Sequence, residues 1–208
     1  YDIALMSREL LGHEAIKKYT TIWMDTVRNG QFGLSNTNKL VRFYDGTTGL
    51  KTGYIREAGF CISASAEREE LSLVAVVMAA PTKEDRMADA AALLNYGFAN
   101  FTAWTPPEES CAAVPVTLGR ADTVALRMEG DSVCVLEKSA VSTVEAERRV
   151  PESLTAPVEE GQQVGELIVR NGGETLLTVP LCAAESVEAV TVFDLFGRFV
   201  RSVTGTGA

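Results

Sequence analysis

Two neighbouring stretches with strand character constrain the fold of this chain more than any other part of its sequence. Residues 60–66 alternate apolar and small polar side chains, and residues 71–78 form an apolar run rich in β-branched residues. Residues 67–70 between them are all charged and suit a tight hairpin turn. Because strands joined so closely pair antiparallel, the sequence predicts an antiparallel sheet here, which ends at Pro81.

A third strand is expected at Lys51-Thr52-Gly53, directly after a glycine-rich turn at residues 45–49. Lys51 offers a positive charge, Thr52 offers a hydroxyl, and Gly53 lacks the Cβ that would keep another backbone away. These residues suit a strand edge that accepts an extended peptide and binds its terminal carboxylate. The alternative is an ordinary hairpin with a surface lysine, because three common residues recur by chance.

Composition limits the classes of protein that this chain can represent. Its 208 residues are 46% hydrophobic and 23% charged, which is typical of a globular protein of one or two domains. The net charge of −9 and the lack of a basic stripe argue against nucleic acid as a partner. No apolar run reaches the roughly 20 residues of a membrane-spanning helix. Because the chain starts without Met, we expect a fragment or a processed product.

Cysteine and histidine usage predicts no metal site and no cofactor. The four cysteines form no Cys-x-x-Cys pair, and His13 is the only histidine. We expect the cysteines to be buried free thiols, although a bridge between Cys134 and Cys182 stays open in an oxidising compartment. We interpret His13 as a surface residue, because nothing near it forms a catalytic dyad.

The N-terminal region predicts short elements of both kinds. Residues 1–11 and 13–19 suit two helices, residues 20–27 a strand, and residues 28–30 a turn. The polar cluster that follows suits a loop, and Leu40 begins a helix or strand.

A long amphipathic helix begins at residue 82 and has acidic residues in its first turn. Met87, Ala91, Leu94 and Phe98 form its apolar stripe. Arg86 lies near the start and, from composition alone, is a solvated helix cation.

The second half of the chain has the pattern of short strands and turns that is typical of an all-β sandwich. Two prolines at residues 105–110 mark a linker, and short strand candidates separated by turns follow it. The candidates lie at residues 113–116, 123–128, 132–136, 141–146, 163–169 and 176–180. Residues 190–203 then place apolar and arginine side chains on opposite helical faces, which suits either a membrane surface or packing against the sandwich.

These features, taken in order, resemble the low-molecular-mass penicillin-binding proteins, which are serine D-alanyl-D-alanine carboxypeptidases. The resemblance is carried by Lys51-Thr52-Gly53, Glu57-Ala58-Gly59-Phe60, the Arg86 helix, and residues 36–40 and 154–165. It implies an α+β fold. Residues 1–104 would be the C-terminal segment of a penicillin-binding domain, with an antiparallel sheet and helices. A linker (105–110), a β-sandwich (111–189) and an amphipathic tail (190–208) would follow.

The resemblance also implies residue roles. Lys51 and Thr52 would bind the terminal D-alanine carboxylate, Gly53 would admit the substrate strand, and Arg86 would strengthen the positive field. The backbone N–H of Tyr54 would be an oxyanion-hole donor. A serine would attack the penultimate peptide carbonyl, and water would hydrolyse the acyl-enzyme.

The chain departs from the family in one respect. Neither Ser-x-x-Lys nor Ser-x-Asn occurs, and the nearest match is Thr48-Gly49-Leu50-Lys51. The nucleophilic serine and its lysine base are therefore expected outside this chain, which alone would be inactive. The missing part would be truncated, lost, or present as a separate chain. The strand at 71–78 and the helix stripe would otherwise expose an apolar face.

Several partners follow from the resemblance. The complete enzyme would act outside the cytoplasm, on the outer face of the membrane, on peptidoglycan stem peptides ending in D-Ala-D-Ala, and would bind β-lactams. The tail at 190–203 would contact the membrane surface. The alternative is a non-catalytic wall or membrane module built on the same fold. A relative of the β-lactamases is disfavoured, because an enzyme that destroys a soluble drug needs neither a β-sandwich domain nor an amphipathic tail.

Overall fold

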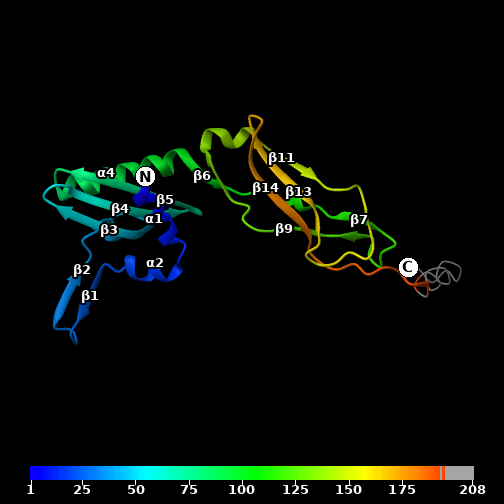
Figure 1. Cartoon of the computed structure of the whole chain (residues 1–208), viewed down its shortest axis with the longest axis horizontal. Coiled ribbons are helices and arrows are strands. Elements are labelled where there is room, and N and C mark those ends of the chain that lie inside the picture. The colour runs from blue at the N-terminus through cyan, green and yellow to red at the C-terminus, as the bar shows by residue number, and fades with distance from the viewer. Residues whose placement is uncertain (193, 195–208) are drawn as a thin grey trace. The chain divides into compact units, whose positions relative to one another are not determined.

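The computed structural model describes residues 1–192 and 194, which divide into two compact units (Figure 1). The first unit comprises residues 1–103 together with 135–139, and the second comprises residues 104–134 and the described residues from 140 onward. Most of the helix expected at 190–203 lies outside the described residues.

A three-stranded antiparallel sheet organises the first unit. Its strands are β3 (Thr47–Ile55), β4 (Gly59–Arg68) and β5 (Leu71–Ala80), in that spatial order. The pairing places Ala64 opposite both Leu50 and Ala75, so β4 is the central strand. The expected hairpin of β4 and β5 is thereby confirmed, and the stretch that contains Lys51-Thr52-Gly53 is an edge strand.

Helix α4 (Lys83–Asn100) begins where the sequence predicts it. Thr82 caps the helix, because its Oγ1 accepts a hydrogen bond from the Asp85 backbone N–H at 3.0 Å. The same hydroxyl donates to the Asp85 carboxylate at 2.7 Å, so Thr82 and Asp85 are joined by two hydrogen bonds at the start of the helix. This double contact fixes where the helix starts and therefore which of its residues face the sheet.

The buried stripe of α4 differs from the expected one by one position. Leu94 is buried as expected, but the other fully buried positions are Arg86, Ala90 and Gly97. These positions share one helical face. Arg86 is thus a core-facing residue rather than the solvated cation that its composition indicated. The face packs against Ile62, Ala64, Ala66, Ala75 and Val77 of the sheet.

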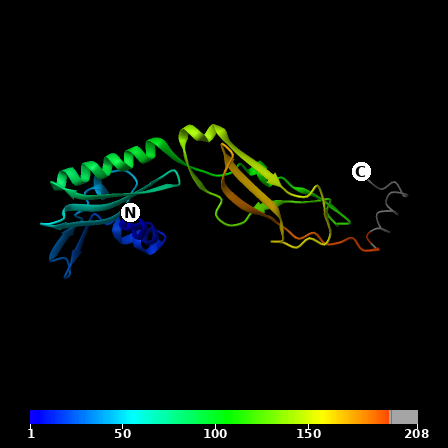
Figure 2. The same ribbon diagram turned by 45° about the horizontal axis from the view of Figure 1, so that its top comes forward.

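The opposite face of the sheet is covered by α1 (Asp2–Leu11) and α2 (Glu14–Thr20), as Figure 2 shows. Here the contact is polar. The hydroxyls of Ser7 and Ser63 lie 2.7 Å apart in a buried hydrogen bond, and Ser65 is fully buried beside them. The alternation of β4 explains both faces, because Ile62 and Ala64 point to α4 while the serines point to α1.

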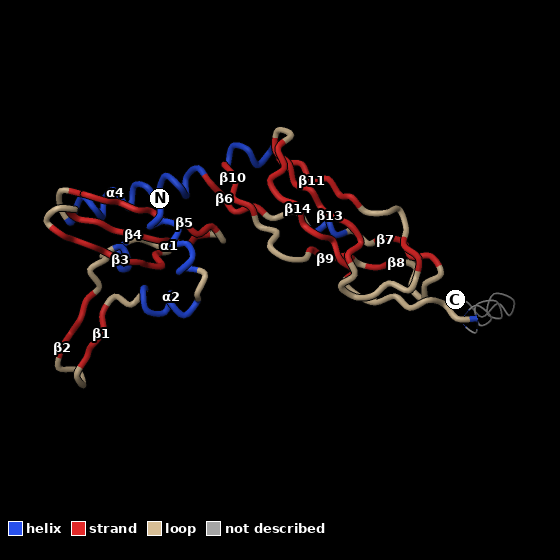
Figure 3. The backbone as a smooth tube through the Cα atoms, viewed as in Figure 1, coloured by secondary structure: helices blue, strands red, loops and turns tan. Residues whose placement is uncertain are grey.

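Two segments before the sheet differ from the expected structure. The strand expected at 20–27 is confined to β1 (Met24–Val27), because α2 extends through Thr20. The expected loop contains β2 (Phe32–Ser35), which pairs with β1 as a separate hairpin (Figure 3). The short helix α3 (Leu40–Phe43) then leads into β3.

The second unit is a β-sandwich, as the sequence predicts. One sheet has the order β11-β13-β14-β9, and the other has the order β12-β7-β8. Side chains from both sheets, including Val116, Val124, Leu167 and Leu181, form one buried core. The larger sheet consists of β9 (Leu126–Met128), β11 (Val144–Arg149), β13 (Gln163–Asn171) and β14 (Glu174–Ala183). The smaller sheet consists of β7 (Val114–Thr117), β8 (Thr123–Val124) and β12 (Leu154–Thr155).

The remaining elements are short. A pair of strands, β6 (Phe101–Trp104) and β10 (Cys134–Glu137), comes from residues that belong mainly to the first unit. Two 3-10 helices, η1 (Glu108–Cys111) and η2 (Lys138–Thr143), follow β6 and β10 in the chain. The four cysteines are free thiols, and only Cys182 is fully buried.

The expectation of an exposed apolar face on β5 and α4 is wrong. These two elements bury their apolar faces against each other, with Ala75 and Leu94 in one core. Single apolar side chains still reach solvent on these two elements, at Met78 of β5 (54% exposed) and Leu93 of α4 (50% exposed), as they do on α1 and β2, where Met6 is 65% and Phe32 is 58% exposed.

Replacing Leu94 should reveal how strongly α4 holds the first unit together. Leu94 is 1% exposed, so Leu94→Ala should lower the free energy of unfolding by about 2–5 kcal/mol through lost burial and a cavity. Guanidinium unfolding, followed by Trp23 fluorescence in a Trp104→Phe background, measures this change. Leu93 is 50% exposed, and Leu93→Ala is the matched control, which should cost well under half as much. Equal losses in both variants would contradict the assigned helix face.

Candidate functional site

The free edge of β3 is the most unusual surface of the first unit. In the described part of the chain, no strand pairs with β3 on the side away from β4. Side chains cover the start of this edge, because Thr20 Oγ1 donates to the Thr48 carbonyl at 2.5 Å and Asn38 Nδ2 donates to the Gly49 carbonyl at 3.0 Å. Neither of these contacts extends past residue 49, and in the described part of the chain no strand pairs with residues 51–55 on this side. Among the carbonyls of these residues, only those of Thr52 and Gly53 accept side-chain hydrogen bonds, from Lys51 and Arg86.

Asparagines fold the segment before α3 against β3. Asn38 is 1% exposed, and its Oδ1 accepts a hydrogen bond from the Leu40 backbone N–H at 3.1 Å. The Asn38 backbone N–H in turn donates to Asn36 Oδ1 at 2.9 Å. The sequence alone gave residues 36–40 a family resemblance but no role. Their role in the structure is to position the loop that borders the edge strand.

The pleat of β3 sends Lys51 and Thr52 to opposite faces of the sheet. Lys51 lies opposite Ser63, on the face covered by α1, whereas Thr52 lies opposite Ile62, on the face covered by α4. The Lys51 ammonium is exposed and donates to the Thr52 carbonyl at 2.5 Å. The two residues are therefore adjacent in sequence but do not share one binding surface.

The Thr52 hydroxyl is held by a second threonine. Thr52 is 9% exposed, and its Oγ1 lies 2.7 Å from Thr37 Oγ1, where either hydroxyl is able to donate. This hydrogen bond connects the edge strand to the loop that Asn38 anchors. It also restricts the rotation of the Thr52 hydroxyl, which fixes the direction in which that hydroxyl offers its proton or lone pairs.

Arg86 lies beneath the same strand. It is 5% exposed, and its Nη1 donates to the carbonyls of Gly53 at 3.3 Å and Cys61 at 3.2 Å. Its guanidinium carbon lies 5.7 Å from the centre of the Phe60 ring. Burial lowers the pKa of Arg86 from its ordinary value, with Cys61 and Glu84 opposing this effect. An arginine nevertheless stays charged in proteins, so the site contains a buried cation.

The buried cation has hydrogen-bonding capacity to spare. Among residues 1–192 and 194, no group accepts a hydrogen bond from the buried Nε of Arg86. Leaving a buried donor unsatisfied costs about 1–3 kcal/mol, and more when the group is charged. An anionic group that bound beside Arg86 would therefore accept this hydrogen bond and remove the cost of the unsatisfied donor.

A pocket of about 640 Å³ opens where these residues meet. It brings together four of the five residues that the sequence singled out, namely Thr52, Gly53, Tyr54 and Arg86. Lys51 is not part of the lining, in agreement with its position on the other face. The sequence alone assigned no binding role to the other lining residues, which are Trp23, Ser35, Asn36, Thr37, Lys39, Phe60 and Lys83.

Gly53 is open toward this pocket. A Cβ added at Gly53 would find only Cys61 Cβ within 4 Å, at an ordinary contact distance of 3.9 Å. By contrast, a Cβ at Gly97 would lie 2.5 Å from Leu73 Cδ1, so glycine is needed there for the close packing of α4 on β5. The fold itself therefore gives no steric reason for glycine at position 53.

In the part of the chain that the structure describes, no three His, Cys, Asp or Glu side chains gather closely enough to hold a metal ion. His13 is exposed at the N-cap of α2 and makes no side-chain capping bond.

Sequence comparisons match successive parts of the chain to two family models. The family described as D-alanyl-D-alanine carboxypeptidase matches residues 1–82, which include β3 and most of its surroundings. The family described as penicillin-binding protein 5, C-terminal domain, matches residues 107–189. The two matches follow each other in the order that the resemblance predicts.

Individual relatives agree with these matches. D-alanyl-D-alanine carboxypeptidase DacF of Bacillus subtilis (strain 168) is 33% identical over 197 residues, covering 90% of this chain and 50% of the relative. D-alanyl-D-alanine carboxypeptidase DacC of Escherichia coli (strain K12) is 27% identical and covers 96% of this chain and 50% of the relative. Along both of its units, this chain is similar to D-alanyl-D-alanine carboxypeptidases.

A solved structure of this carboxypeptidase family has the same fold. Penicillin binding protein 5 from Haemophilus influenzae superposes with a TM-score of 0.66 at 25% identity, covering 90% of this chain and 56% of that chain. The expected family and the expected α+β fold are both confirmed. The chain spans about half the length of the curated carboxypeptidases that it matches.

Asn38 should be essential for positioning the start of the edge strand. Asn38→Leu keeps a similar volume but leaves the Gly49 carbonyl and the Leu40 N–H without their partners. The free energy of unfolding should fall by about 1–3 kcal/mol for each unsatisfied group. Denaturant unfolding of the first unit measures this loss.

The matched control for Asn38 is Asn95, which is exposed and accepts a hydrogen bond from the Tyr44 hydroxyl. Asn95→Leu should change the free energy of unfolding by no more than about 0.5 kcal/mol. If Asn38→Leu proved equally mild, the asparagine contacts would not be what holds the loop against β3.

Proposed function

We propose that the complete protein is a serine D-alanyl-D-alanine carboxypeptidase and that this chain supplies the wall of its active site that binds the terminal carboxylate. The observation that carries this proposal is the buried Arg86 guanidinium. It is anchored to the Gly53 and Cys61 carbonyls, directly behind the free edge of β3. A carboxylate at the end of an edge-bound peptide provides the anion that this cation lacks.

The geometry suggests how the substrate lies. The stem peptide pairs with the free edge of β3 as an additional strand, and its last carboxylate meets the Thr52 hydroxyl and Arg86. Gly53 gives the substrate backbone room to approach. The backbone N–H of Tyr54 serves as one oxyanion-hole donor, toward the charge that develops in the tetrahedral intermediate. Lys51 contributes positive charge from the opposite face of the strand.

The reaction proceeds in two steps on this wall. A serine attacks the carbonyl of the penultimate D-alanine, the peptide bond breaks, and the terminal D-alanine leaves with a proton on its amine. Water then hydrolyses the ester and regenerates the serine. The serine and its lysine base come from outside this chain, because Ser-x-x-Lys does not occur in its sequence.

The cellular setting follows from the substrate. The peptidoglycan that such an enzyme trims lies outside the cytoplasm, so we place the protein there, on the outer face of the membrane, where β-lactams also reach it. None of the helices in residues 1–192 and 194 is long and apolar enough to cross a membrane. Within this proposal, residues 190–203 contact the membrane surface, because their sequence places apolar and arginine side chains on opposite helical faces. The boundaries at 104, 110 and 189 remain our proposed division into domains.

A non-catalytic wall-binding module is the second candidate function. It would use the same edge strand and the same carboxylate pocket, and the lack of Ser-x-x-Lys in this sequence favours it. The upstream reading frame decides between the two candidates. Ser-x-x-Lys upstream, or a separate chain that carries it and copurifies with this one, supports the enzyme.

Gly53 offers a direct test of the edge-strand proposal. Gly53→Ala should weaken binding of N-acetyl-D-Ala-D-Ala about fivefold or more, because its Cβ meets the incoming backbone. The free energy of unfolding should stay within about 1 kcal/mol of the original, since the fold leaves room for the methyl group. Quenching of Trp23 fluorescence measures binding, because this indole lines the pocket.

Gly33→Ala is the matched control for Gly53→Ala, since nothing lies within 4 Å of its added Cβ and it does not line the pocket. It should bind the peptide like the unchanged chain. If Gly53→Ala also bound the peptide normally, the substrate strand would not run along this edge.

The chain alone should not react with penicillin. A fluorescent penicillin should leave no covalent label on the isolated 208 residues, because the acylated serine of the family motif is absent. Gel fluorescence and intact mass measure the label. The positive control is the product of the complete reading frame, if Ser-x-x-Lys lies upstream. Stoichiometric labelling of the isolated chain would mean that a residue within it is the nucleophile.

A further inference from the structure

The pocket beside β3 is positive although the chain as a whole is negative. The net charge of the sequence is −9, yet Lys39, Lys83 and Arg86 all line this pocket and no Asp or Glu does. Among the described residues, neither lysine ammonium donates a hydrogen bond to a protein group or forms a salt bridge. The two lysines therefore have no anionic partner of their own there.

The backbone of each lysine is held in place. Lys39 directly follows Asn38, whose side chain is tied to the Gly49 carbonyl and the Leu40 N–H. Lys83 is the first residue of α4 and directly follows Thr82, which caps the helix through Asp85. The side chains reach solvent, but both start from fixed points at the rim of the pocket.

A second cavity of about 320 Å³ adjoins this rim. It shares Thr37, Lys39, Lys83 and Arg86 with the first, and its lining adds Glu84, the single carboxylate in the described linings of the two cavities. Glu84 acts in the opposite electrostatic sense, because its charge stabilises the protonated Arg86 and raises its pKa. The chain thus offers two cations and one anion whose effects on a bound carboxylate should have opposite signs.

We propose that Lys39 and Lys83 are specificity-determining residues that make the pocket prefer a peptide with a free terminal carboxylate over the same peptide ending in an amide. The inference rests on the proposed function, because it assumes that the peptide end lies beside Arg86. Arg86 binds the carboxylate at short range. The lysines act through their field, which a neutral amide does not feel.

Salt separates the two contributions. The Debye length is about 8 Å at physiological ionic strength and about 3 Å at 1 M. The contribution of exposed lysines is therefore screened, whereas that of the buried guanidinium persists. Exposed ion pairs change affinity modestly, so each lysine should contribute about two- to fivefold to the preference for the acid.

The experiment compares two ligands on the 208-residue chain. Dissociation constants for N-acetyl-D-Ala-D-Ala and for its C-terminal amide are measured by Trp23 fluorescence at low and high salt, in a Trp104→Phe background. The acid-over-amide preference should fall about two- to fivefold in Lys39→Gln and in Lys83→Gln, and should rise in Glu84→Gln. The salt dependence should weaken in both lysine variants, and Lys39→Arg and Lys83→Arg should restore it.

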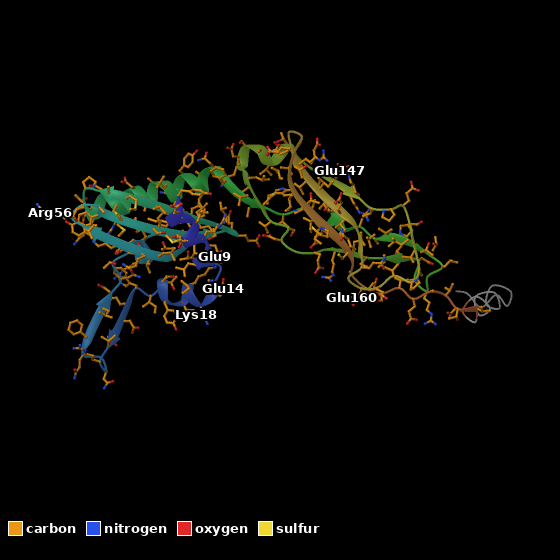
Figure 4. All side chains as sticks on the ribbon, in the orientation of Figure 1. Glu9, Glu14, Lys18, Arg56, Glu147 and Glu160 are labelled. Atoms are coloured by element: carbon orange, nitrogen blue, oxygen red, sulfur yellow. The ribbon has the colours of Figure 1, made fainter. Side chains whose placement is uncertain are left out.

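Lys18→Gln is the matched control. Lys18 is an exposed lysine on α2, on the side of the sheet away from α4 (Figure 4), and it lines neither cavity. It changes the net charge by the same amount as the test variants. The Lys18→Gln variant should prefer the acid over the amide as strongly as the unchanged chain does. Circular dichroism checks that every variant is folded.

The outcomes distinguish the two proposals. If the chain prefers the acid and Arg86→Gln reduces this preference, but both lysine variants keep it, the lysine inference is wrong and the proposed function stands. If the chain has no preference for the acid, or Arg86→Gln leaves it unchanged, the proposed function and the inference both fail. Loss of preference in Lys18→Gln to the same extent would also overturn the inference, because net charge alone would then explain it.

Discussion

The packing of α4 on the central strand β4 is the interaction on which the candidate site depends. Ala90 and Leu94 are buried against Ile62 and Ala64, where small side chains bring helix and sheet close together. One turn before Ala90, on the same buried face, lies Arg86. The hydrophobic contact thus carries a charged group into the interior, where burial is costly unless the charge is hydrogen-bonded. Two backbone carbonyls partly meet that need.

A second constraint determines where an extended ligand is able to bind. An edge strand with a free row of backbone groups tends to pair with other chains, and proteins usually cover or interrupt such edges. Here Thr20 and Asn38 cover the start of β3 and stop at Gly49. The part of the edge without a paired strand coincides with the Thr52 hydroxyl and the buried Arg86, which is why we propose that a peptide backbone and its terminal carboxylate bind there together.

Local patterns predicted the elements that depend on near neighbours. The β4–β5 hairpin and the capped start of α4 could be predicted from the sequence, because the alternation of apolar and polar side chains and helix capping each involve only a few neighbouring residues. β2 was missed, because its short apolar pattern is interrupted by Gly33 and preceded by a turn. The stripe of α4 was predicted correctly at Leu94, but Met87, Ala91 and Phe98 pack only partly buried against the core, because its centre also includes Arg86, which had been assigned to solvent from its charge.

The sequence by itself determined the strands, the helix start, the sandwich rhythm and the residues that carry the family resemblance, because each depends on the order of neighbouring side chains. Only the tertiary structure decided that Thr52 and Arg86 meet at one pocket while Lys51 points to the other face. It also brought Thr37, Lys39 and Lys83 to that pocket. Contacts between residues far apart in the chain depend on how helix and strands pack, and no short sequence pattern specifies that packing.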